Sequence, residues 1–147
     1  IITKNKAKIM NTILNLKIYT LNQLFLEEVI KKIYVYGKEG LYAIFPNHQD
    51  YISSFEDGML YFEKENNKKV YIGINQGILT KCGREVQIST FNSIYGGNSI
   101  EELKKNVEKA IFESQNEIEI DKKLKTSLKQ IEFELLEQIK LFGKKNE

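Results

Sequence analysis

Alternation of apolar and polar residues dominates the first two thirds of the chain. Three apolar residues spaced two apart, Leu14, Leu16 and Ile18, share one face, and the residues between them are polar. This period of two is typical of a half-buried β-strand. A second β-type run extends from Leu24 to Tyr36, and its alternation is interrupted by one lysine. We interpret this run as one continuous strand.

Short β-type runs separated by turn signals continue to about residue 95. Asp57-Gly58, Asn66-Asn67 and Cys82-Gly83 mark three tight turns, because Gly and Asn tolerate left-handed backbone dihedrals. No helical period stands between the runs. Closely spaced short strands without intervening helices predict an antiparallel β-sandwich or barrel. The expected strands after the first two runs cover residues 51–55, 59–65, 70–74, 77–83 and 85–90.

After Gly96-Gly97 the apolar period changes to that of a helix. Ser99 and Glu102 have the spacing of a capping box at a helix start. Between residues 116 and 121 the phase breaks without Gly or Pro, so the sequence leaves open whether two helices fold back as a hairpin or form one bent rod. Their narrow stripes favour helices that cover each other over a helix free to bind a groove. The stripes are Leu103, Val107, Ala110, Ile111 and Ser114, then Leu124, Leu128, Ile131, Leu135, Ile139 and Phe142.

The pattern predicts an N-terminal antiparallel β-sandwich followed by a C-terminal two-helix hairpin. Residues 10–95 form the predicted sandwich and residues 99–143 the predicted helical domain. Residues 1–9 are interpreted as a disordered extension, because Met10 resembles a natural start. A chain of 147 residues is long enough for one such domain with an appendage.

Composition and charge narrow the classes of function. The net charge is only +2 and the lysines alternate with glutamates, so nucleic acid is not an expected partner. The single Cys82 rules out an internal disulfide and is typical of a reducing compartment. We expect a packed structural thiol there. No apolar run is long enough to span a bilayer, so membrane association is expected only through partners.

The only proline and the only histidine lie in one stretch, residues 36–51. Gly37 and Gly40 permit a tight turn, and Pro46 restricts its own φ and that of the residue before it. The stretch predicts a strand, a turn, a short strand and a rigid corner. His48 has no nucleophile or acidic residue in a catalytic pattern beside it and is expected to make a loop hydrogen bond. We therefore predict a docking surface, with no catalytic residue, cofactor or metal.

A strip of lysines lies in the predicted second helix, at Lys122, Lys123, Lys125 and Lys129. A solvated helix face is the simpler interpretation, and binding to an acidic partner is the alternative. The sequence has no phosphate-binding loop, because the Gly37–Gly40 pair is not followed by Lys-Ser or Lys-Thr and a helix.

Six short motifs follow one another along the chain: Glu28-Val29, the Gly37-x-x-Gly40…Pro46-Asn47-His48 corner, Gly58-Met59-Leu60, Gly77-Ile78-Leu79, Val86-x-Ile88-Ser89-Thr90 and the helix start at Ser99. Taken in order, they resemble the epsilon subunit of F-type ATP synthases, called delta in mitochondria. The match extends from about Met10 to the C-terminus. The runs Gly77–Thr90 and Asn47–Tyr51 resemble the alternate, often sodium-linked branch of these enzymes.

The resemblance implies a non-catalytic rotor subunit of the central stalk, which couples ion movement through the c ring to ATP synthesis or hydrolysis. It implies a sandwich packed on the gamma subunit and loops facing the c ring. Peripheral attachment at the cytoplasmic face of the cell membrane follows. The residues implied on the ring side are Gly37, Lys38, Glu39, Gly40, Leu41, Pro46 and His48. A polar residue is common in the family at the position of Leu41, so Glu39 is the remaining acidic contact.

Some family members bind ATP on the C-terminal helices through an Ile/Leu-Asp-x-x-Arg-Ala motif. Here Ile120 and Asp121 match, whereas the Arg and Ala do not, so ATP binding is not expected. The resemblance implies that the helices regulate the enzyme by extending toward the alpha/beta head, with Asp121, Lys122, Lys123, Lys125 and Lys129 in the regulatory helix.

Two other classes of function compete with this one. The chain could be a free-standing β-sandwich adaptor that binds a protein partner through its helical tail. A small-ligand-binding enzyme is the third class, and the sequence disfavours it because no catalytic constellation is present.

Overall fold

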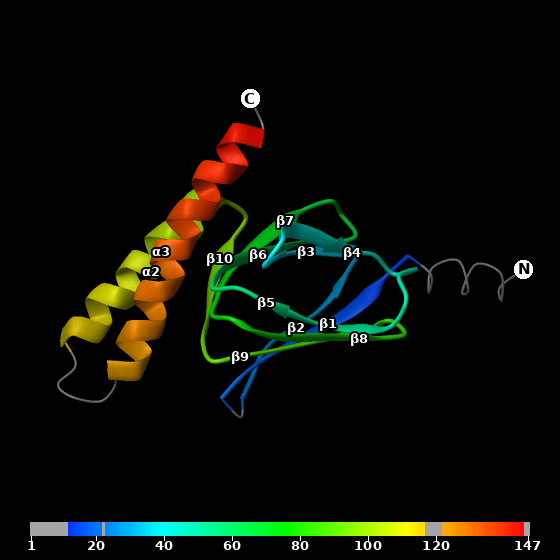
Figure 1. Cartoon of the computed structure of the whole chain (residues 1–147), viewed down its shortest axis with the longest axis horizontal. Coiled ribbons are helices and arrows are strands. Elements are labelled where there is room, and N and C mark those ends of the chain that lie inside the picture. The colour runs from blue at the N-terminus through cyan, green and yellow to red at the C-terminus, as the bar shows by residue number, and fades with distance from the viewer. Residues whose placement is uncertain (1–11, 22, 117–121, 146–147) are drawn as a thin grey trace, which may run out of the picture.

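The computed structural model of this protein describes residues 12–21, 23–116 and 122–145. Two five-stranded sheets face each other, and two helices cover the outer face of one of them (Figure 1). This arrangement confirms the predicted sandwich followed by a pair of helices. The predicted extension at residues 1–9 lies outside the described residues.

The strands divide into two sheets, here called sheet 1 and sheet 2. Sheet 1 has the order β2-β1-β9-β8-β5 and contains β1 (Leu14–Thr20), β2 (Gln23–Ile30), β5 (Tyr51–Phe55), β8 (Gly77–Cys82) and β9 (Glu85–Thr90). Sheet 2 has the order β10-β7-β6-β3-β4 and contains β3 (Lys32–Gly37), β4 (Gly40–Ile44), β6 (Gly58–Glu63), β7 (Lys69–Ile74) and β10 (Ser93–Gly97).

One strand pair departs from the antiparallel prediction. β1 lies parallel to β9, with Leu16 opposite Val86, and every other pair among the described strands is antiparallel. A backbone hydrogen bond of 2.7 Å from Asn15 N to Arg84 O starts this pairing. Alternation within a strand identifies its buried face but carries no information about the direction of a partner 70 residues away.

The prediction of one strand from Leu24 to Tyr36 is wrong. One strand, β2, ends at Ile30 and the next, β3, begins at Lys32, so that β2 lies in sheet 1 and β3 in sheet 2. Ile30 and Ile33 are both fully buried although they are three positions apart. Residues on one face of a strand are separated by even numbers, so both can point inward only if the chain turns between them. The lysine that interrupts the alternation marks this turn.

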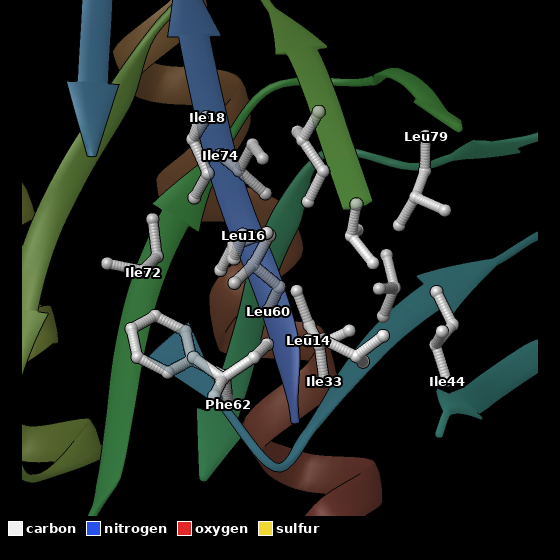
Figure 2. Close-up of a cluster of buried hydrophobic side chains, with 14 of the residues drawn as sticks. Leu14, Leu16, Ile18, Ile33, Ile44, Leu60, Phe62, Ile72, Ile74 and Leu79 are labelled. Carbon is white, nitrogen blue, oxygen red and sulfur yellow. The ribbon is translucent and has the colours of Figure 1, made fainter. Parts of the chain in front are cut away.

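The space between the sheets is filled by aliphatic side chains and phenylalanine (Figure 2). Leu14, Leu16 and Ile18 of β1 are fully buried, as their alternation predicts. The remaining members of this core are Ile30, Ile33, Val35, Ile44, Phe55, Leu60, Phe62, Val70, Ile72, Ile74, Leu79, Val86 and Ile88. All of them precede the helices in the chain, so the sandwich has a core of its own.

The helices α2 (Ile100–Asn116) and α3 (Lys122–Lys145) pack against each other and against the outer face of sheet 2 (Figure 1). The side chain of Ser99 caps α2 by accepting a hydrogen bond of 3.1 Å from Glu102 N, as predicted. Both predicted apolar stripes face inward: Leu103, Val107, Ile111, Leu128, Ile131 and Leu135 are buried, and Ala110, Leu124, Ile139 and Phe142 are partly buried. The helices thus form a hairpin, and they also dock on the sandwich, which the sequence did not predict.

Candidate functional site

The β3–β4 hairpin ends in an exposed two-residue turn. Gly37 pairs with Gly40 across it, and Lys38 and Glu39 form the turn. Gly40 has a φ of +113°, a conformation that L-residues with side chains rarely adopt. Leu41 is half-buried and packs against the cluster beneath the helices. This segment, residues 37–41, is called the hairpin tip, and it presents one lysine and one glutamate to the outside.

Pro46 and His48 lie at the other end of β4 from the hairpin tip. Within sheet 2, Ile44 is paired with Ile33, and Gly40 is paired with Gly37. A strand of five residues separates the two ends by about 16 Å. The structure therefore does not bring the predicted ring-side residues together. They form two separate patches, the hairpin tip and a second segment, residues 45–50, called the corner.

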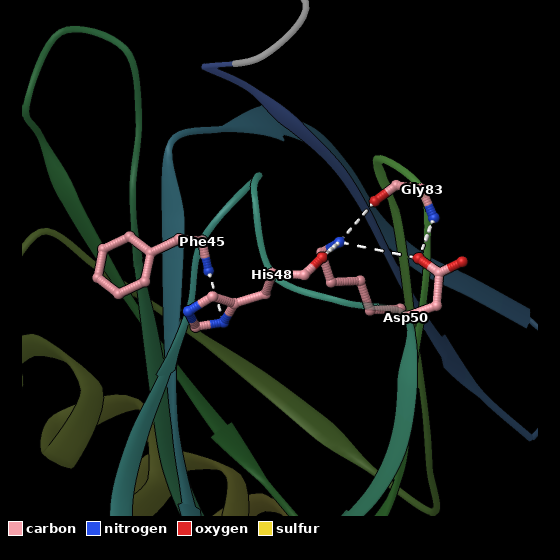
Figure 3. Close-up of polar contacts among 5 residues, drawn as sticks. Phe45, His48, Asp50 and Gly83 are labelled. Atoms are coloured by element: carbon pink, nitrogen blue, oxygen red, sulfur yellow. Dashed lines mark hydrogen bonds and ion pairs between the residues drawn. The ribbon is translucent and has the colours of Figure 1, made fainter.

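The corner is closed by its own hydrogen bonds. His48 N donates to Phe45 O at 3.1 Å, and Phe45 N donates to His48 Nδ1 at 3.5 Å. The two rings meet edge to face with centroids 5.2 Å apart. These contacts confirm the prediction of a loop histidine that makes a hydrogen bond, and Figure 3 shows the imidazole turned toward Phe45.

A buried lysine fastens the corner to the β8–β9 turn (Figure 3). Lys81 is 3% exposed, and its Nζ donates to His48 O and, at 2.8 Å, to Gly83 O. A carboxylate oxygen of Asp50 lies 3.9 Å from Nζ and also accepts a hydrogen bond of 2.7 Å from Gly83 N. Because a buried ammonium needs oxygen partners, these contacts hold two loops from different parts of the chain in one arrangement.

Sequence reasoning missed Lys81, although its position gave a signal. In β8 it lies two residues after the fully buried Leu79, and therefore on the inward face. A lysine whose side chain points inward must find hydrogen-bond acceptors for its ammonium group, so this position predicts oxygen atoms close to it. The next residue, Cys82, points outward and is exposed, so the prediction of a packed thiol is wrong.

Replacing Lys81 with methionine is expected to loosen the corner without unfolding the sandwich. Methionine keeps the apolar stem but leaves the oxygens of His48 and Gly83 without their charged donor, a loss of about 2 kcal/mol. Amide hydrogen exchange at residues 46–50 should accelerate together with that at 82–84. Lys68, which is exposed at the β6–β7 turn, provides the matched control. Equal exchange in Lys81→Met and Lys68→Met would show that the ammonium contacts are not what orders the corner.

The predicted basic strip lies largely on the solvent side of α3. Lys123 and Lys129 are exposed and Lys125 is partly exposed. Lys122 begins the helix, but its side chain, like the whole of Asp121, lies outside the described part of the chain. This placement is what a solvated helix face requires, and it also leaves these lysines accessible to an acidic partner.

Polar contacts join α3 to the end of the sandwich at which β6 begins and β7 ends. Gln138 is 5% exposed; its side chain accepts a hydrogen bond of 2.8 Å from Met59 N and donates one of 3.0 Å to Asp57 O. Eleven residues earlier in the helix, Ser127 O accepts a hydrogen bond of 3.0 Å from Asn75 Nδ2. These contacts are called the polar clasp. Sequence reasoning missed it, although a glutamine three residues after Leu135 falls on the apolar stripe of α3.

Tyrosine dominates the surface of sheet 2 on which the helices dock. Tyr36, Tyr61 and Tyr71 are buried there, and Tyr61 stacks on Tyr34 with ring centroids 4.6 Å apart and touches Phe142 of α3. Among the described residues, the buried members of the core between the sheets include no tyrosine, and Tyr42 and Tyr51 only pack against it partly buried. A tyrosine ring has an apolar body and a polar tip and is tolerated both in a core and in water. This surface is therefore suited to a contact that can open.

The tyrosines predict a loss of stability at high pH. Burial raises the pKa of Tyr61 to about 12 from an ordinary value of 10. The unfolded chain then loses this proton at a lower pH than the folded chain. The free energy of unfolding therefore falls as pH rises from 10 to 12, and this tyrosine does not change it below pH 10. Urea unfolding between pH 8 and 12 should show this decline.

The matched variant for this measurement is Tyr61→Phe, which removes the titrating hydroxyl but keeps the ring. Its unfolding free energy should fall less steeply above pH 10 than that of the natural chain. The residual slope is expected from Tyr51, whose pKa burial also raises to about 12, and from Tyr36, Tyr42 and Tyr71, whose pKa values burial also raises. Parallel curves for the two proteins would contradict the assignment to Tyr61.

The described residues contain neither a membrane-spanning helix nor a cluster of metal ligands. Among residues 12–21, 23–116 and 122–145, none of the helices has the length and apolarity needed to cross a bilayer. Over the same residues, His, Cys, Asp and Glu side chains do not gather in any group able to hold a metal ion. The features that stand out are protein surfaces: the hairpin tip, the corner and the helix docking face.

Two comparisons of the amino-acid sequence with known proteins identify similarity to the same protein family. The family model for the ATP synthase, delta/epsilon chain, beta-sandwich domain matches residues 13–94. A curated relative, the ATP synthase epsilon chain of Sulfurovum sp. (strain NBC37-1), is 28% identical over 65 residues. The aligned region is 44% of this chain and 51% of that protein, so the chain spans about half the length of this relative.

Solved structures share the fold. A chain in the cryo-EM structure of the Euglena gracilis mitochondrial ATP synthase, OSCP/F1/c-ring in rotational state 1, superposes with a TM-score of 0.60 and 22% identity, covering 86% of this chain and 80% of that one. A chain in the central stalk/c-ring structure of the Tetrahymena thermophila mitochondrial ATP synthase has a TM-score of 0.51 and 14% identity, covering 87% and 95%.

Proposed function

Because this chain belongs to the ATP synthase delta/epsilon family, we propose that it is a non-catalytic subunit of the central stalk of a rotary ATP synthase. Its partners are the gamma subunit and the c ring, and the alpha/beta head is reached through the C-terminal helices. It sits at the cytoplasmic face of the cell membrane, held there by these partners. The match over residues 13–94 is the observation that carries the proposal.

The architecture supports a mechanical role. Torque passes through a subunit by shape and packing, which requires a stiff body. The sandwich has its own closed core, and the Lys81 contacts join the corner to the β8–β9 turn. Close-packed protein cores resist deformation.

We assign the ring contact to the hairpin tip alone. One face of a ring meets only one end of the sandwich, and the tip and the corner lie at opposite ends of β4. The tip is exposed and carries Lys38 and Glu39, which suit a polar loop of a neighbouring subunit. Pro46 and His48, at the other end, face away from the ring in this arrangement.

Cross-linking in the assembled enzyme tests the function and the orientation together. In a Cys82→Ser background, cysteine at Glu39 should form a cross-link to the c ring. Glu65 is an exposed glutamate at the β6–β7 turn, at the opposite end of sheet 2, so cysteine there should not. A cross-link only from position 65 would reverse the orientation. Absence of this chain from purified enzyme that retains gamma and the c ring would reject the proposed function in favour of an adaptor.

We also propose that the helices regulate the enzyme by leaving the sandwich and extending toward the head. The polar clasp and the tyrosine surface support this proposal. When the helices leave, the polar groups of the clasp and the tyrosine hydroxyls can form hydrogen bonds with water instead. The lysines at 123, 125 and 129 are available to acidic groups on the head.

A further inference from the structure

The histidine of the corner accepts a hydrogen bond that its own protonation would remove. Phe45 N donates to Nδ1 of His48 at 3.5 Å (Figure 3). A neutral imidazole has one nitrogen that carries a proton and one that accepts, whereas both nitrogens of an imidazolium are donors. The contact with Phe45 therefore requires the form in which Nδ1 is free and Nε2 carries the proton. Histidine side chains change charge between pH 5 and 8, so this contact depends on pH.

The N–H group of Phe45 lies just beyond the β3–β4 ladder. Strand β4 ends at Ile44, which pairs with Ile33, so the ladder does not extend to Phe45, and the imidazole of His48 supplies the acceptor instead. Protonation of Nδ1 would place two N–H groups opposite each other. The imidazolium must then rotate away, and the Phe45 N–H group is left to water, which reaches it because the corner is exposed.

The charged side chains around the corner are paired with each other. Lys81 donates from Nζ to His48 O, and Nζ of Lys32 lies 5.8 Å from the centroid of the phenyl ring of the corner. The carboxylate of Asp50 lies 3.9 Å from the first of these ammonium groups. The carboxylate of Glu63 lies 2.9 Å from the second. Both acids are thus engaged by lysines, so neither of them holds the imidazole in place.

We propose that His48 is a pH switch for the corner. In the neutral form, Nδ1 accepts from Phe45 N and the imidazole is held against the backbone. In the protonated form this hydrogen bond is absent and the imidazolium turns to water. The contact from His48 N to Phe45 O involves no titrating group, so the turn itself persists in both forms. The switch does not depend on the proposed function, in which it lies at the end of the sandwich away from the ring.

Solvent-exchange NMR on the full chain tests this switch. The protection factor of the Phe45 amide, which corrects for the intrinsic effect of pH on exchange, should fall about fivefold between pH 8 and pH 5, as expected for the loss of one hydrogen bond. The midpoint should coincide with the titration of the His48 ring protons. The amide of Asn67, which donates to the backbone oxygen of Lys64 at 2.9 Å in another exposed turn, should keep its protection.

Two variants at the same position isolate the acceptor. His48→Asn places an oxygen where Nδ1 lies and does not titrate, so the Phe45 amide should stay protected at both pH values. His48→Ala has no acceptor, so protection should be low at both. No fall in the natural chain, or an equal fall in His48→Asn, would overturn the switch. A fall with a midpoint at about pH 4 that Asp50→Asn abolishes would also overturn it and assign the pH dependence to Asp50. Circular dichroism verifies that each variant keeps the sandwich.

Discussion

Replacing Gly58 with alanine is expected to destabilise the chain by about 4 kcal/mol and to release α3 from the sandwich. Gly58 has a φ of +138°, and an added Cβ would lie 2.2–2.4 Å from three side-chain atoms of Gln138. The backbone strain costs about 1–2 kcal/mol. Gln138 must also withdraw, which leaves the buried groups at Met59 N and Asp57 O without partners at about 1–3 kcal/mol each.

Urea unfolding and amide exchange along α3 measure these effects, and Gly83 supplies a matched control. Gly83 also has a positive φ, of +60°, but a Cβ there meets no atom within 4 Å. Gly83→Ala should therefore cost only the strain of about 1 kcal/mol. Adding Gln138→Ala to Gly58→Ala should cause little further loss, because the Gln138 hydrogen bonds are already broken. Similar losses from Gly58→Ala and Gly83→Ala would show that the Gln138 contacts contribute nothing.

Local pattern predicted most of the fold, because alternation and capping depend on near neighbours. The buried face of β1 follows from Leu14, Leu16 and Ile18, and the start of α2 follows from Ser99 and Glu102. Pairing between distant strands could not be obtained this way. The parallel contact of β1 with β9, and the change of sheet at Lys31, depend on how the sheets close around their common core.

The candidate site was only partly predictable for the same reason. The turn at Gly37–Gly40 and the bend at Pro46 are local features, and both are present. Their separation to opposite ends of β4 depends on the pairing of β3 with β4. Lys81 and Gln138 contact residues more than 30 and nearly 80 positions away, so the sequence marked them only as polar residues on apolar faces.

The sandwich has a core that does not depend on the helices, and this is the physical basis of the regulation that we propose. All members of its core come from residues 14–88, so undocking removes no core side chain. The surface uncovered beneath the helices is rich in tyrosine, including Tyr36, Tyr61 and Tyr71, whose hydroxyls can bind water. The polar clasp likewise exchanges its hydrogen bonds for water. Opening leaves the core between the sheets intact, and it uncovers the apolar stripes of the helices, including Leu103, Ile131 and Leu135.

Deleting residues 99–147 from this subunit in the assembled enzyme is expected to raise ATP hydrolysis by roughly fivefold, which corresponds to a coupling of about 1 kcal/mol. The deletion removes the helices that we propose contact the head, while the sandwich keeps the gamma and ring contacts. The full-length variant Lys125→Glu with Lys129→Glu separates charge from bulk, because it keeps both helices and reverses two exposed charges; it should reproduce part of the increase. Unchanged hydrolysis in an enzyme that still contains the truncated subunit would contradict regulation by the helices, and because the sandwich would still be assembled, it would leave the stalk role intact.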